Sequence, residues 1–204
     1  MALLGATGWP AKLSEGRVRL RPIQVRDAEA WYELRARNHA WLSSWEATTP
    51  GGSSQQLTFK QMVRRLRREA RAGRVLPFAV LYEGKLVGQL TVANIIWGSV
   101  CSASMGYWVD QRHAGRGIIP TAVALATDHC FKVVRLHRME VAIRPENHAS
   151  LRVVEKLGFR SEGLRPKYLH IDGEWRDHLL FALNADEVPE GLLARWKATR
   201  MVPP

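Results

Sequence analysis

The sequence predicts an α/β (α+β) fold in which helices cover both faces of a mixed sheet. Two observations lead to this prediction. Short strand-like runs, some alternating and some continuously apolar, are interleaved with segments whose apolar residues recur every three or four positions. The order is one strand, two helices, an antiparallel run of three strands, a helix, a strand, a helix and two strands. A chain of 204 residues suits one domain with a proper core.

The boundaries of these elements follow from the residues that start and stop them. Pro22 stops the first strand, Asp27 can cap the first helix, and Gly73 and Gly158 end helices in the expected way. Strands are expected at 18–21, 76–82, 86–97, 105–109, 138–143, from 159 and at 175–183, and helices from 27 and at 57–72, 117–134, 147–158 and 189–199. Residues 1–16 are predicted to be an N-terminal lead-in, 17–185 the folded domain, and 186–204 a C-terminal helical extension.

Charge and composition limit the classes of function. The chain has 30 Lys and Arg against 19 Asp and Glu, a net charge of +11, which favours an anionic partner such as a polyphosphate cofactor, an acidic protein or RNA. The helix at 57–72 carries a run of arginines, which is either a solvated face or a docking surface for RNA or the ribosome. Only two cysteines, no zinc-ligand spacing among the histidines and no long apolar run predict a cytoplasmic protein without a metal site or a membrane span.

The stretch 105–123 contains the strongest functional signal. An apolar strand ends at Val109, a basic loop follows, and a helix begins near Gly117. Free N–H groups and the positive end of the helix dipole make such a helix N-terminus an anion site, and glycines let the backbone approach a ligand closely. The spacing Arg112-x-x-Gly115-x-Gly117 lacks the third glycine of a dinucleotide-binding fingerprint and the Gly-Lys-Ser/Thr of a P-loop.

This spacing resembles the pyrophosphate-binding motif, Arg/Gln-x-x-Gly-x-Gly/Ala, of the GNAT superfamily of acetyl-CoA-dependent N-acetyltransferases. A second match lies one strand later, where Asn147 begins a helix that ends at Gly158-Phe159. Within the superfamily the chain is most similar to the RimJ/RimL branch, the N-terminal acetyltransferases of ribosomal proteins, and especially to its RimJ-like members. The residues that carry this closer resemblance are Tyr107-Trp108, Ser150, the aromatic segment 39–46 and the stretch 168–179. The resemblance covers residues 17–185.

The resemblance implies a fold and a cofactor site. The fold would be the GNAT fold, a mixed, mostly antiparallel sheet of roughly six to seven strands with helices on both faces. The cofactor would be acetyl-CoA, with coenzyme A as the product. The residues expected to bind it are Tyr107, Trp108, Val109, Arg112, His113, Ala114, Gly115, Arg116, Gly117, Ile118 and Asn147.

Acetyl transfer needs a proton donor for the departing thiolate and the loss of a proton from the acceptor amine. Many GNAT enzymes use a tyrosine seven residues after the asparagine, where this chain has Val154. RimL-like members have a serine at the position of Ser150, which is the expected acid or hydrogen-bond donor to sulfur; the alternative is a hydroxyl that serves the first turn of its helix. Glu140 or Glu46 could act as the base through a water; the alternatives are a charge on the sheet face for Glu140 and a solvated loop position for Glu46. Asp177 is a third carboxylate, which strand alternation places among apolar residues.

The resemblance also implies the activity. The expected reaction is direct transfer of an acetyl group, in a ternary complex, to the N-terminal α-amine of a protein, with a ribosomal protein as acceptor. Trp41, Trp45 and Tyr168 are expected to line the acceptor groove, with core packing as the alternative. The rival functions are acetylation of a small amine (a polyamine or aminoglycoside) or of a protein lysine and, in another class, non-catalytic binding of RNA or the ribosome. The sequence leaves the oligomeric state open.

Overall fold

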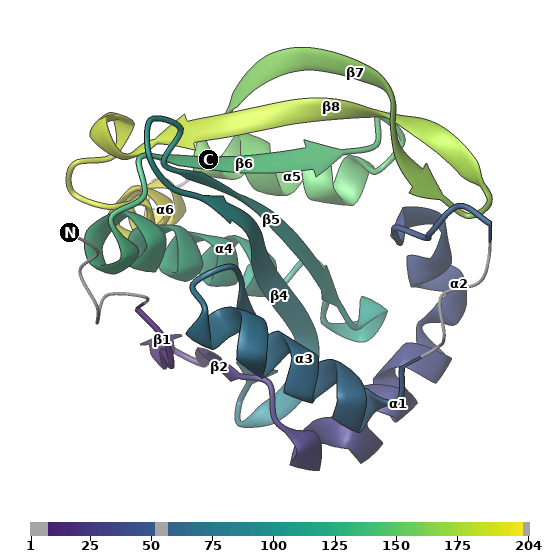
Figure 1. Cartoon of the computed structure of the whole chain (residues 1–204). Coiled ribbons are helices and arrows are strands. Elements are labelled where there is room, and N and C mark those ends of the chain that lie inside the picture. Colours follow the sequence, from purple (N-terminus) through teal and green to yellow (C-terminus); the bar gives the residue numbers. More distant parts are fainter. Residues whose placement is uncertain (1–7, 52–56, 202–204) are drawn as a thin grey trace.

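The computed structural model describes residues 8–51 and 57–201, and within them eight strands form one sheet in the order β1-β2-β3-β4-β5-β6-β8-β7 (Figure 1). Neighbouring strands are antiparallel except β5 and β6, which are parallel. The strands are β1 (Leu13–Glu15), β2 (Val18–Pro22), β3 (Leu76–Tyr82), β4 (Lys85–Ile96), β5 (Ser102–Val109), β6 (Arg138–Ile143), β7 (Arg160–Ile171) and β8 (Glu174–Asn184). The sheet is therefore mixed and mostly antiparallel, which confirms the predicted architecture.

Helices connect and cover these strands. They are α1 (Ala28–Arg37), α2 (His39–Leu42), α3 (Phe59–Arg71), α4 (Ile118–His129), α5 (His148–Leu157) and α6 (Leu192–Met201). A π-helical turn, Cys130–Val134, extends α4. Each helix and strand expected from the sequence is present, with ends that differ from the expected ones by a few residues.

The N-terminal segment differs from the prediction. Residues 1–16 were expected to be a lead-in, but Leu13–Glu15 form β1 and pair with β2, with Leu13 opposite Leu20. The sheet therefore has eight strands among the described residues, one more than the upper end of the expected six to seven. A strand of three residues is too short to show an alternating pattern, and tertiary contacts hold this one in place. Trp9, just before it, packs edge-on against the buried ring of Phe78 with 5.2 Å between ring centroids.

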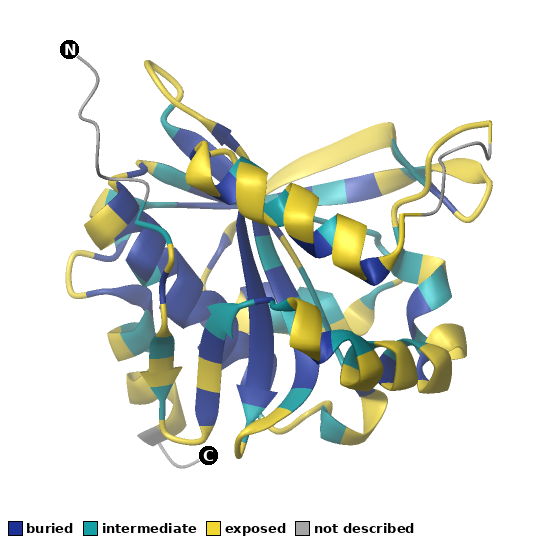
Figure 2. Cartoon of the chain, turned by 60° about the horizontal axis from the view of Figure 1, so that its bottom comes forward, coloured by how far each residue is buried: buried dark blue, intermediate teal, exposed yellow. Residues whose placement is uncertain are grey.

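Helices pack on both faces of the sheet, as predicted. On one face α4 and α5 contribute the largest cluster of buried apolar side chains together with the central strands. On the other face Phe59 and Val63 of α3 and Trp31 of α1 pack against Ile23 and Leu81. Figure 2 shows the consequence for α3, whose sheet-facing side is buried and whose outer side is exposed.

The C-terminal helix α6 belongs to the core. The side chain of Trp196 is 6% exposed, and its indole Nε1–H donates a hydrogen bond to Thr121 Oγ1 at 2.9 Å. The Asp128 carboxylate of α4 accepts hydrogen bonds from the backbone N–H groups of Leu192 and Leu193 at 2.6 and 3.1 Å. These N–H groups begin α6 and have no partner within their own helix, so Asp128 supplies it. Because the sheet covers one side of α4 and α6 covers another, α4 is buried on almost all sides.

Strands β5 and β6 diverge after a short parallel contact, and this positions the site. Their pairing ends at Ser104 and Glu140. From there β5 continues to Val109 alongside β4, while β6 stays paired with β8. In an extended strand, alternate residues direct their backbone N–H and C=O groups to opposite sides. The last residues of β5 therefore present backbone polar groups to the gap that β6 leaves.

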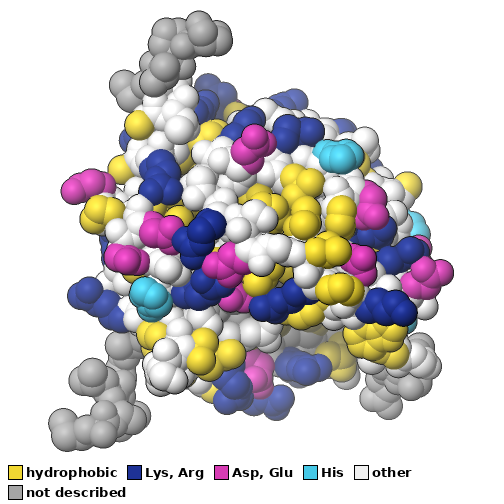
Figure 3. Space-filling model, turned by 90° about the horizontal axis from the view of Figure 1, so that it is seen from above, with side chains coloured by type: hydrophobic (Ala, Val, Ile, Leu, Met, Phe, Trp, Pro, Cys, Tyr) yellow, Lys and Arg dark blue, Asp and Glu magenta, His cyan; other side chains and the backbone are white. Residues whose placement is uncertain are grey.

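The hairpin of β7 and β8 reaches back to the segment after α2. Ala47 forms an isolated antiparallel bridge with Ile171, and the backbone N–H of Thr48 donates to the carbonyl of His170 at 2.8 Å. Figure 3 looks onto the β7–β8 side, where Lys and Arg side chains are interspersed with Asp and Glu. The hairpin thus fixes the loop that closes one end of the gap between β5 and β6.

In the part of the chain that the structure describes, no helix is both long and apolar enough to span a membrane. Those same residues contain no group of three or more His, Cys, Asp or Glu side chains arranged to hold a metal ion.

Candidate active site

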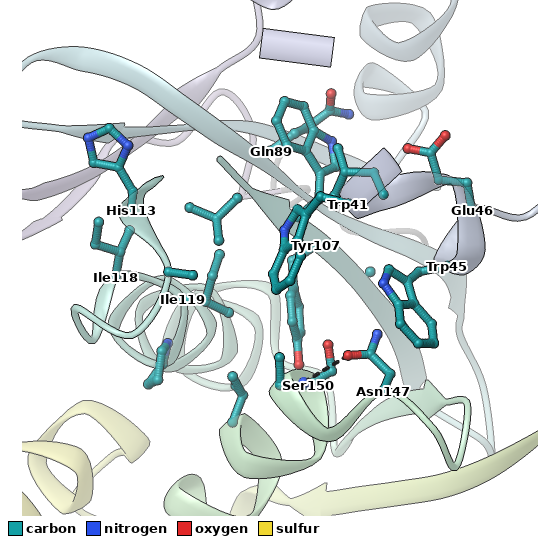
Figure 4. A pocket seen from close by; sticks show the side chains of 18 of the residues that line it. Trp41, Trp45, Glu46, Gln89, Tyr107, His113, Ile118, Ile119, Asn147 and Ser150 are labelled. Atoms are coloured by element: carbon teal, nitrogen blue, oxygen red, sulfur yellow. Dashed lines mark hydrogen bonds between the residues drawn. The ribbon is translucent and has the colours of Figure 1, made fainter. Parts of the chain in front are cut away.

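A cavity of about 950 Å³ lies where β5 and β6 diverge. It extends from the glycine loop and the start of α4, past the end of β5 and the start of α5, to the segment after α2 (Figure 4). The expected site residues that line it are Trp41, Trp45, Glu46, Tyr107, Trp108, Val109, His113, Ala114, Gly115, Gly117, Ile118, Asn147 and Ser150. The structure therefore brings most of the expected cofactor, catalytic and acceptor residues to one cavity.

Asp110 holds the glycine loop in place at the first end of this cavity. Its carboxylate is 1% exposed and receives the Arg112 backbone N–H at 3.3 Å and the guanidinium groups of Arg37 and Arg112, each at 3.2 Å. Burial disfavours the ionised carboxylate, but hydrogen bonds from Arg112 and Asn38 and the charge of Arg37 outweigh it, so the pKa of Asp110 falls to about 2. Asp110 is therefore an anionic anchor for the loop. It was not among the residues expected from the sequence, although its place directly after a strand and before basic residues is a signal for such a role.

The loop leads into α4 through two glycines in the left-handed region. Gly115 and Gly117 have φ values of +78° and +76°, which side-chain-bearing residues rarely adopt. Gly117 is the N-cap of α4 and has no side chain to occupy the first N–H groups, and Pro120 in the first turn has no N–H. The N–H groups of Ile118 and Ile119 are thus left for an anion. Lys156 and Arg152 of α5 line the same cavity and add positive charge.

Two of the expected cofactor residues do not line the cavity. The guanidinium of Arg112 is directed to the buried Asp110 carboxylate instead, because that carboxylate follows the strand and attracts the nearest cations. Arg116 is exposed between the two glycines and is absent from the cavity wall. Only His113 of the basic residues in this loop lines the cavity.

Asn147, Ser150 and Tyr107 meet at the middle of the cavity (Figure 4). Asn147 is the N-cap of α5, and its side-chain oxygen accepts a hydrogen bond from the backbone N–H of Ser150 at 3.1 Å. The Tyr107 ring comes from β5 and places its buried hydroxyl beside Ser150. Burial raises the pKa of Tyr107, and contact with the Ser150 hydroxyl acts in the opposite direction. Val154, at the position where many family members have tyrosine, is fully buried in the core.

Tryptophans and one ion pair form the second end of the cavity. Arg35 of α1 makes a bidentate pair with Glu46, through its two terminal guanidinium nitrogens. The Arg35 guanidinium lies 5.4 Å from the ring centroid of Trp31 and 5.6 Å from that of Trp108, so it is held between cation–π partners. Burial lowers the pKa of Arg35. Arg35 was not among the residues expected from the sequence; its one signal is its place four residues after Trp31 on the same helix face.

Three residues considered for catalysis or acceptor binding lie elsewhere. Glu140 is on β6 outside the cavity and accepts a hydrogen bond from Arg138 Nε at 2.8 Å, because β6 turns away from β5 at this residue. Tyr168 is exposed on β7, where Arg165 lies over its ring. Asp177 was expected among buried residues but is exposed, and it accepts the backbone N–H of Lys167 at 2.7 Å. None of these three lines the cavity.

Comparison with known sequences agrees with this geometry. A sequence profile of the Acetyltransferase (GNAT) domain family matches residues 17–160, more than half of the chain. The chain belongs to the GNAT acetyltransferase family. The GNAT fold, with acetyl-CoA as the cofactor, therefore accounts for the sheet, the glycine loop and the cavity.

Individual relatives and one solved structure indicate the branch of the family to which the chain is most similar. The chain is 33% identical over 175 residues to the probable N-acetyltransferase YjcK of Bacillus subtilis, covering 82% of this chain and 94% of YjcK. It is 26% identical over 182 residues to the ribosomal protein uS5–alanine N-acetyltransferase of Escherichia coli, covering 88% and 94%. Among solved structures, Mycobacterium smegmatis RimJ in complex with CoA-disulfide superposes with a TM-score of 0.88 at 42% identity, over 95% of this chain and 96% of that one. The protein is an acetyl-CoA-dependent acetyltransferase of RimJ/RimL-like type.

The cavity fits that cofactor. Acetyl-CoA supplies the activated acetyl thioester, and its pyrophosphate needs backbone N–H donors that no side chain obstructs. A Cβ added at Gly115 would meet no atom within 4 Å, so the loop leaves open space in front of its backbone. The GNAT enzyme thus has an uncapped helix N-terminus, a glycine loop and flanking cations at one end of a single cavity.

Proposed function

We propose that this enzyme acetylates the N-terminal α-amine of a protein, and that the acceptor is a ribosomal protein. The main support is the likeness to Mycobacterium smegmatis RimJ over nearly the whole of both chains. The Escherichia coli relative whose name specifies an alanine of ribosomal protein uS5 points in the same direction. Such an acceptor would place the enzyme in the cytoplasm.

The two ends of the cavity suggest how the substrates approach. The cofactor pyrophosphate would rest on the loop from His113 to Ile118, and the thioester carbonyl would accept a backbone N–H from the end of β5, at Tyr107, Trp108 or Val109. Asn147 would contact the cofactor through its side-chain amide. The acceptor would enter from the other end, past Trp41 and Trp45, and meet the thioester beside Ser150.

The amine must reach the thioester in its neutral form. A free α-amine has a pKa of about 8, so roughly a tenth of it is neutral at pH 7 and only modest assistance is needed. Within the described residues, Glu46 and Glu146 are the carboxylates that line the cavity, and each is paired with an arginine. Because both Glu46 oxygens are already paired with the Arg35 guanidinium, Glu46 serves better as an anchor for the acceptor ammonium than as the group that accepts its proton, and water takes the proton.

A basic surface on α3 would add a contact with ribosomal RNA. Four arginines on its outer side are exposed and form no ion pair with any described residue: Arg64, Arg65, Arg67 and Arg71. A second cavity, of about 780 Å³, lies beside them and is lined by Lys12, Arg26, Arg67 and Arg71 without an acidic residue. Unpaired cations of this kind attract phosphates irrespective of RNA sequence. On the β7–β8 side, by contrast, Lys and Arg side chains are interspersed with Asp and Glu (Figure 3).

Peptide specificity tests the proposal. The purified enzyme is given acetyl-CoA and a peptide that copies the N-terminus of a ribosomal protein, the same peptide with a blocked N-terminus and an internal lysine, and spermidine. We expect turnover with the first peptide, at a kcat/KM at least tenfold above that for the other two. Comparable or better rates with the blocked peptide would indicate a lysine acetyltransferase, and better rates with spermidine would indicate a small-amine acetyltransferase.

A further inference from the structure

The hydroxyl of Tyr107 is buried at the cavity wall and forms no well-made hydrogen bond with the described residues. Tyr107 follows Met105 by two positions in β5, so both side chains point to the face that α4 and α5 cover. In Figure 4 the ring extends toward the start of α5 and ends at Ser150. A buried hydroxyl without a well-made hydrogen bond contributes little or nothing to stability, because its desolvation is not fully compensated.

Ser150 has a free hydroxyl at the same place. A serine in the first helical turn often bonds to nearby backbone, which was the alternative role considered for Ser150. Here Asn147 already accepts the backbone N–H of Ser150, at 3.1 Å. The Ser150 hydroxyl forms no hydrogen bond within residues 8–51 and 57–201 other than its contact with Tyr107. Two hydroxyls with no other partner therefore face each other in the cavity.

The direction of this interaction follows from protonation. Burial raises the pKa of Tyr107, so the phenol keeps its proton at neutral pH. A protonated phenol that is otherwise unpartnered can donate to Ser150 Oγ. The serine O–H is then free to point away from Tyr107, into the cavity between the cofactor loop and the acceptor end.

We propose that Tyr107 is a positioning residue for acetyl transfer, whose hydroxyl donates to Ser150 Oγ and directs the Ser150 O–H at the sulfur of the departing coenzyme A. In this step the acceptor nitrogen bonds to the acetyl carbon, and the C–S bond breaks with its electron pair going to sulfur. The surplus proton on nitrogen goes to water. Ser150 keeps its proton and stabilises the sulfur anion by a hydrogen bond, which the Tyr107 donor strengthens. The proposal depends on acetyl transfer from acetyl-CoA and not on the identity of the acceptor.

Three readouts on Tyr107→Phe test this pairing, and the first needs no acceptor. The pKa of the thiol of bound coenzyme A is measured from the ultraviolet absorbance of the thiolate as pH is raised. We expect this pKa to be higher in Tyr107→Phe and in Ser150→Ala than in the wild type. We also expect kcat to fall about tenfold in Tyr107→Phe with the KM for acetyl-CoA unchanged. Thermal unfolding of the unliganded variant should occur near the wild-type Tm, because the loss of one weak hydrogen bond to Ser150 is offset by removing the cost of burying the hydroxyl.

The controls separate positioning from packing. Thr127 has a second buried hydroxyl without a partner among the described residues, on α4 and outside the cavity. Thr127→Val should match the Tm behaviour of Tyr107→Phe and leave both the thiol pKa and kcat at wild-type values. The double variant Tyr107→Phe/Ser150→Ala should be no slower than Ser150→Ala, because Tyr107 acts through Ser150.

Specific results would overturn the proposal. An unchanged thiol pKa in Tyr107→Phe would mean that Tyr107 does not stabilise the coenzyme A thiolate. Additive losses in the double variant would mean that Tyr107 acts without Ser150. A lower Tm together with a raised KM would indicate that the phenol is merely structural. Failure of the N-terminal peptide to be acetylated would overturn the proposed acceptor but would leave the thiol titration intact, so the two failures are distinguishable.

Discussion

The side-chain oxygen of Asn147 accepts a hydrogen bond from the backbone N–H of Ser150 at 3.1 Å. This bond caps α5 and leaves the hydroxyl of Ser150 free in the cavity. One short polar side chain therefore fixes the start of a helix and the position of the residue proposed to face the cofactor sulfur. Stability and activity are coupled at this point of the fold.

Replacing Asn147 by alanine should lower both the stability of the fold and the rate of acetyl transfer. Loss of an N-cap costs about 1 kcal/mol in the free energy of unfolding. We expect kcat to fall roughly ten- to a hundredfold, because small displacements of a reacting group are costly. Asn147→Ser, which restores a capping oxygen, should regain most of the stability. Thr58, the N-cap of α3, gives a matched control, since it accepts the backbone N–H of Gln61 outside the cavity. Thr58→Ala should lose similar stability and keep its kcat; an equal loss of kcat would contradict the account.

Asp110 should make stability depend on pH in the acid range. Its folded pKa of about 2 lies below the unfolded value near 3.9, so its stabilisation is present above pH 4 and is lost as pH falls from about 4 to about 2. Asp110→Asn should therefore lose about 2 kcal/mol of unfolding free energy at pH 7, and the difference from wild type should shrink below pH 4. Urea denaturation at several pH values measures this. The exposed Glu83, paired with Arg17, is the control, and Glu83→Gln should show no such pH-dependent difference. A loss in Asp110→Asn that is constant down to pH 3 would contradict the assignment.

Glu46 and Glu140 should respond differently to the same substitution. If Glu46 anchors the acceptor ammonium, Glu46→Gln should raise the KM for the peptide roughly tenfold and leave kcat and acetyl-CoA affinity near wild type. Glu140→Gln should change neither kcat nor the KM for the peptide, because Glu140 is paired with Arg138 outside the cavity. Steady-state kinetics over a range of pH distinguishes the roles. A large fall in kcat for Glu46→Gln, with a lost basic limb of the pH profile, would make Glu46 the general base instead.

The α3 surface should matter only for an acceptor that is bound to RNA. Arg67→Glu/Arg71→Glu should acetylate the free peptide at the wild-type rate and the same acceptor within a ribosomal particle more slowly. The wild-type rate on the particle should fall with added salt, and the variant should have a shallower dependence. Arg135→Glu/Lys167→Glu makes the same change in net charge on other elements, with Lys167 on β7. If that control loses as much rate on the particle, net charge rather than the α3 surface is responsible.

Local signals explain what the sequence predicted. The strand, the glycine loop and the helix are adjacent in the chain, and the glycines at 115 and 117 are needed there because φ is positive at both. The cap at Asn147 is likewise a relation between residues three apart. The expected helices and strands are present for the same reason, since short-range periodicity and stop residues determine them.

Long-range pairing explains what the sequence could not predict. Ala47 and Thr48 are held by residues 170 and 171, more than a hundred positions later, and that contact shapes the acceptor end. Glu140 was misplaced because the divergence of β5 and β6 has no local signal. Asp177 was assigned to the wrong surroundings because both faces of β8 carry apolar residues. Alternation holds, but the buried face is that of His178, Leu180 and Ala182, and Asp177 lies on the other face.

Calorimetric titration with acetyl-CoA tests the central claim, that the glycine loop and the uncapped end of α4 bind the cofactor. Gly115 and Gly84 make a matched pair, with φ values of +78° and +82° and no atom within 4 Å of an added Cβ. Glutamate at either site carries the same backbone strain and the same charge, but only residue 115 lines the cavity. We predict that the wild type and Gly84→Glu bind acetyl-CoA equally and that Gly115→Glu binds at least about tenfold more weakly. Equal binding by all three proteins, or an equal loss in both variants, would contradict the account.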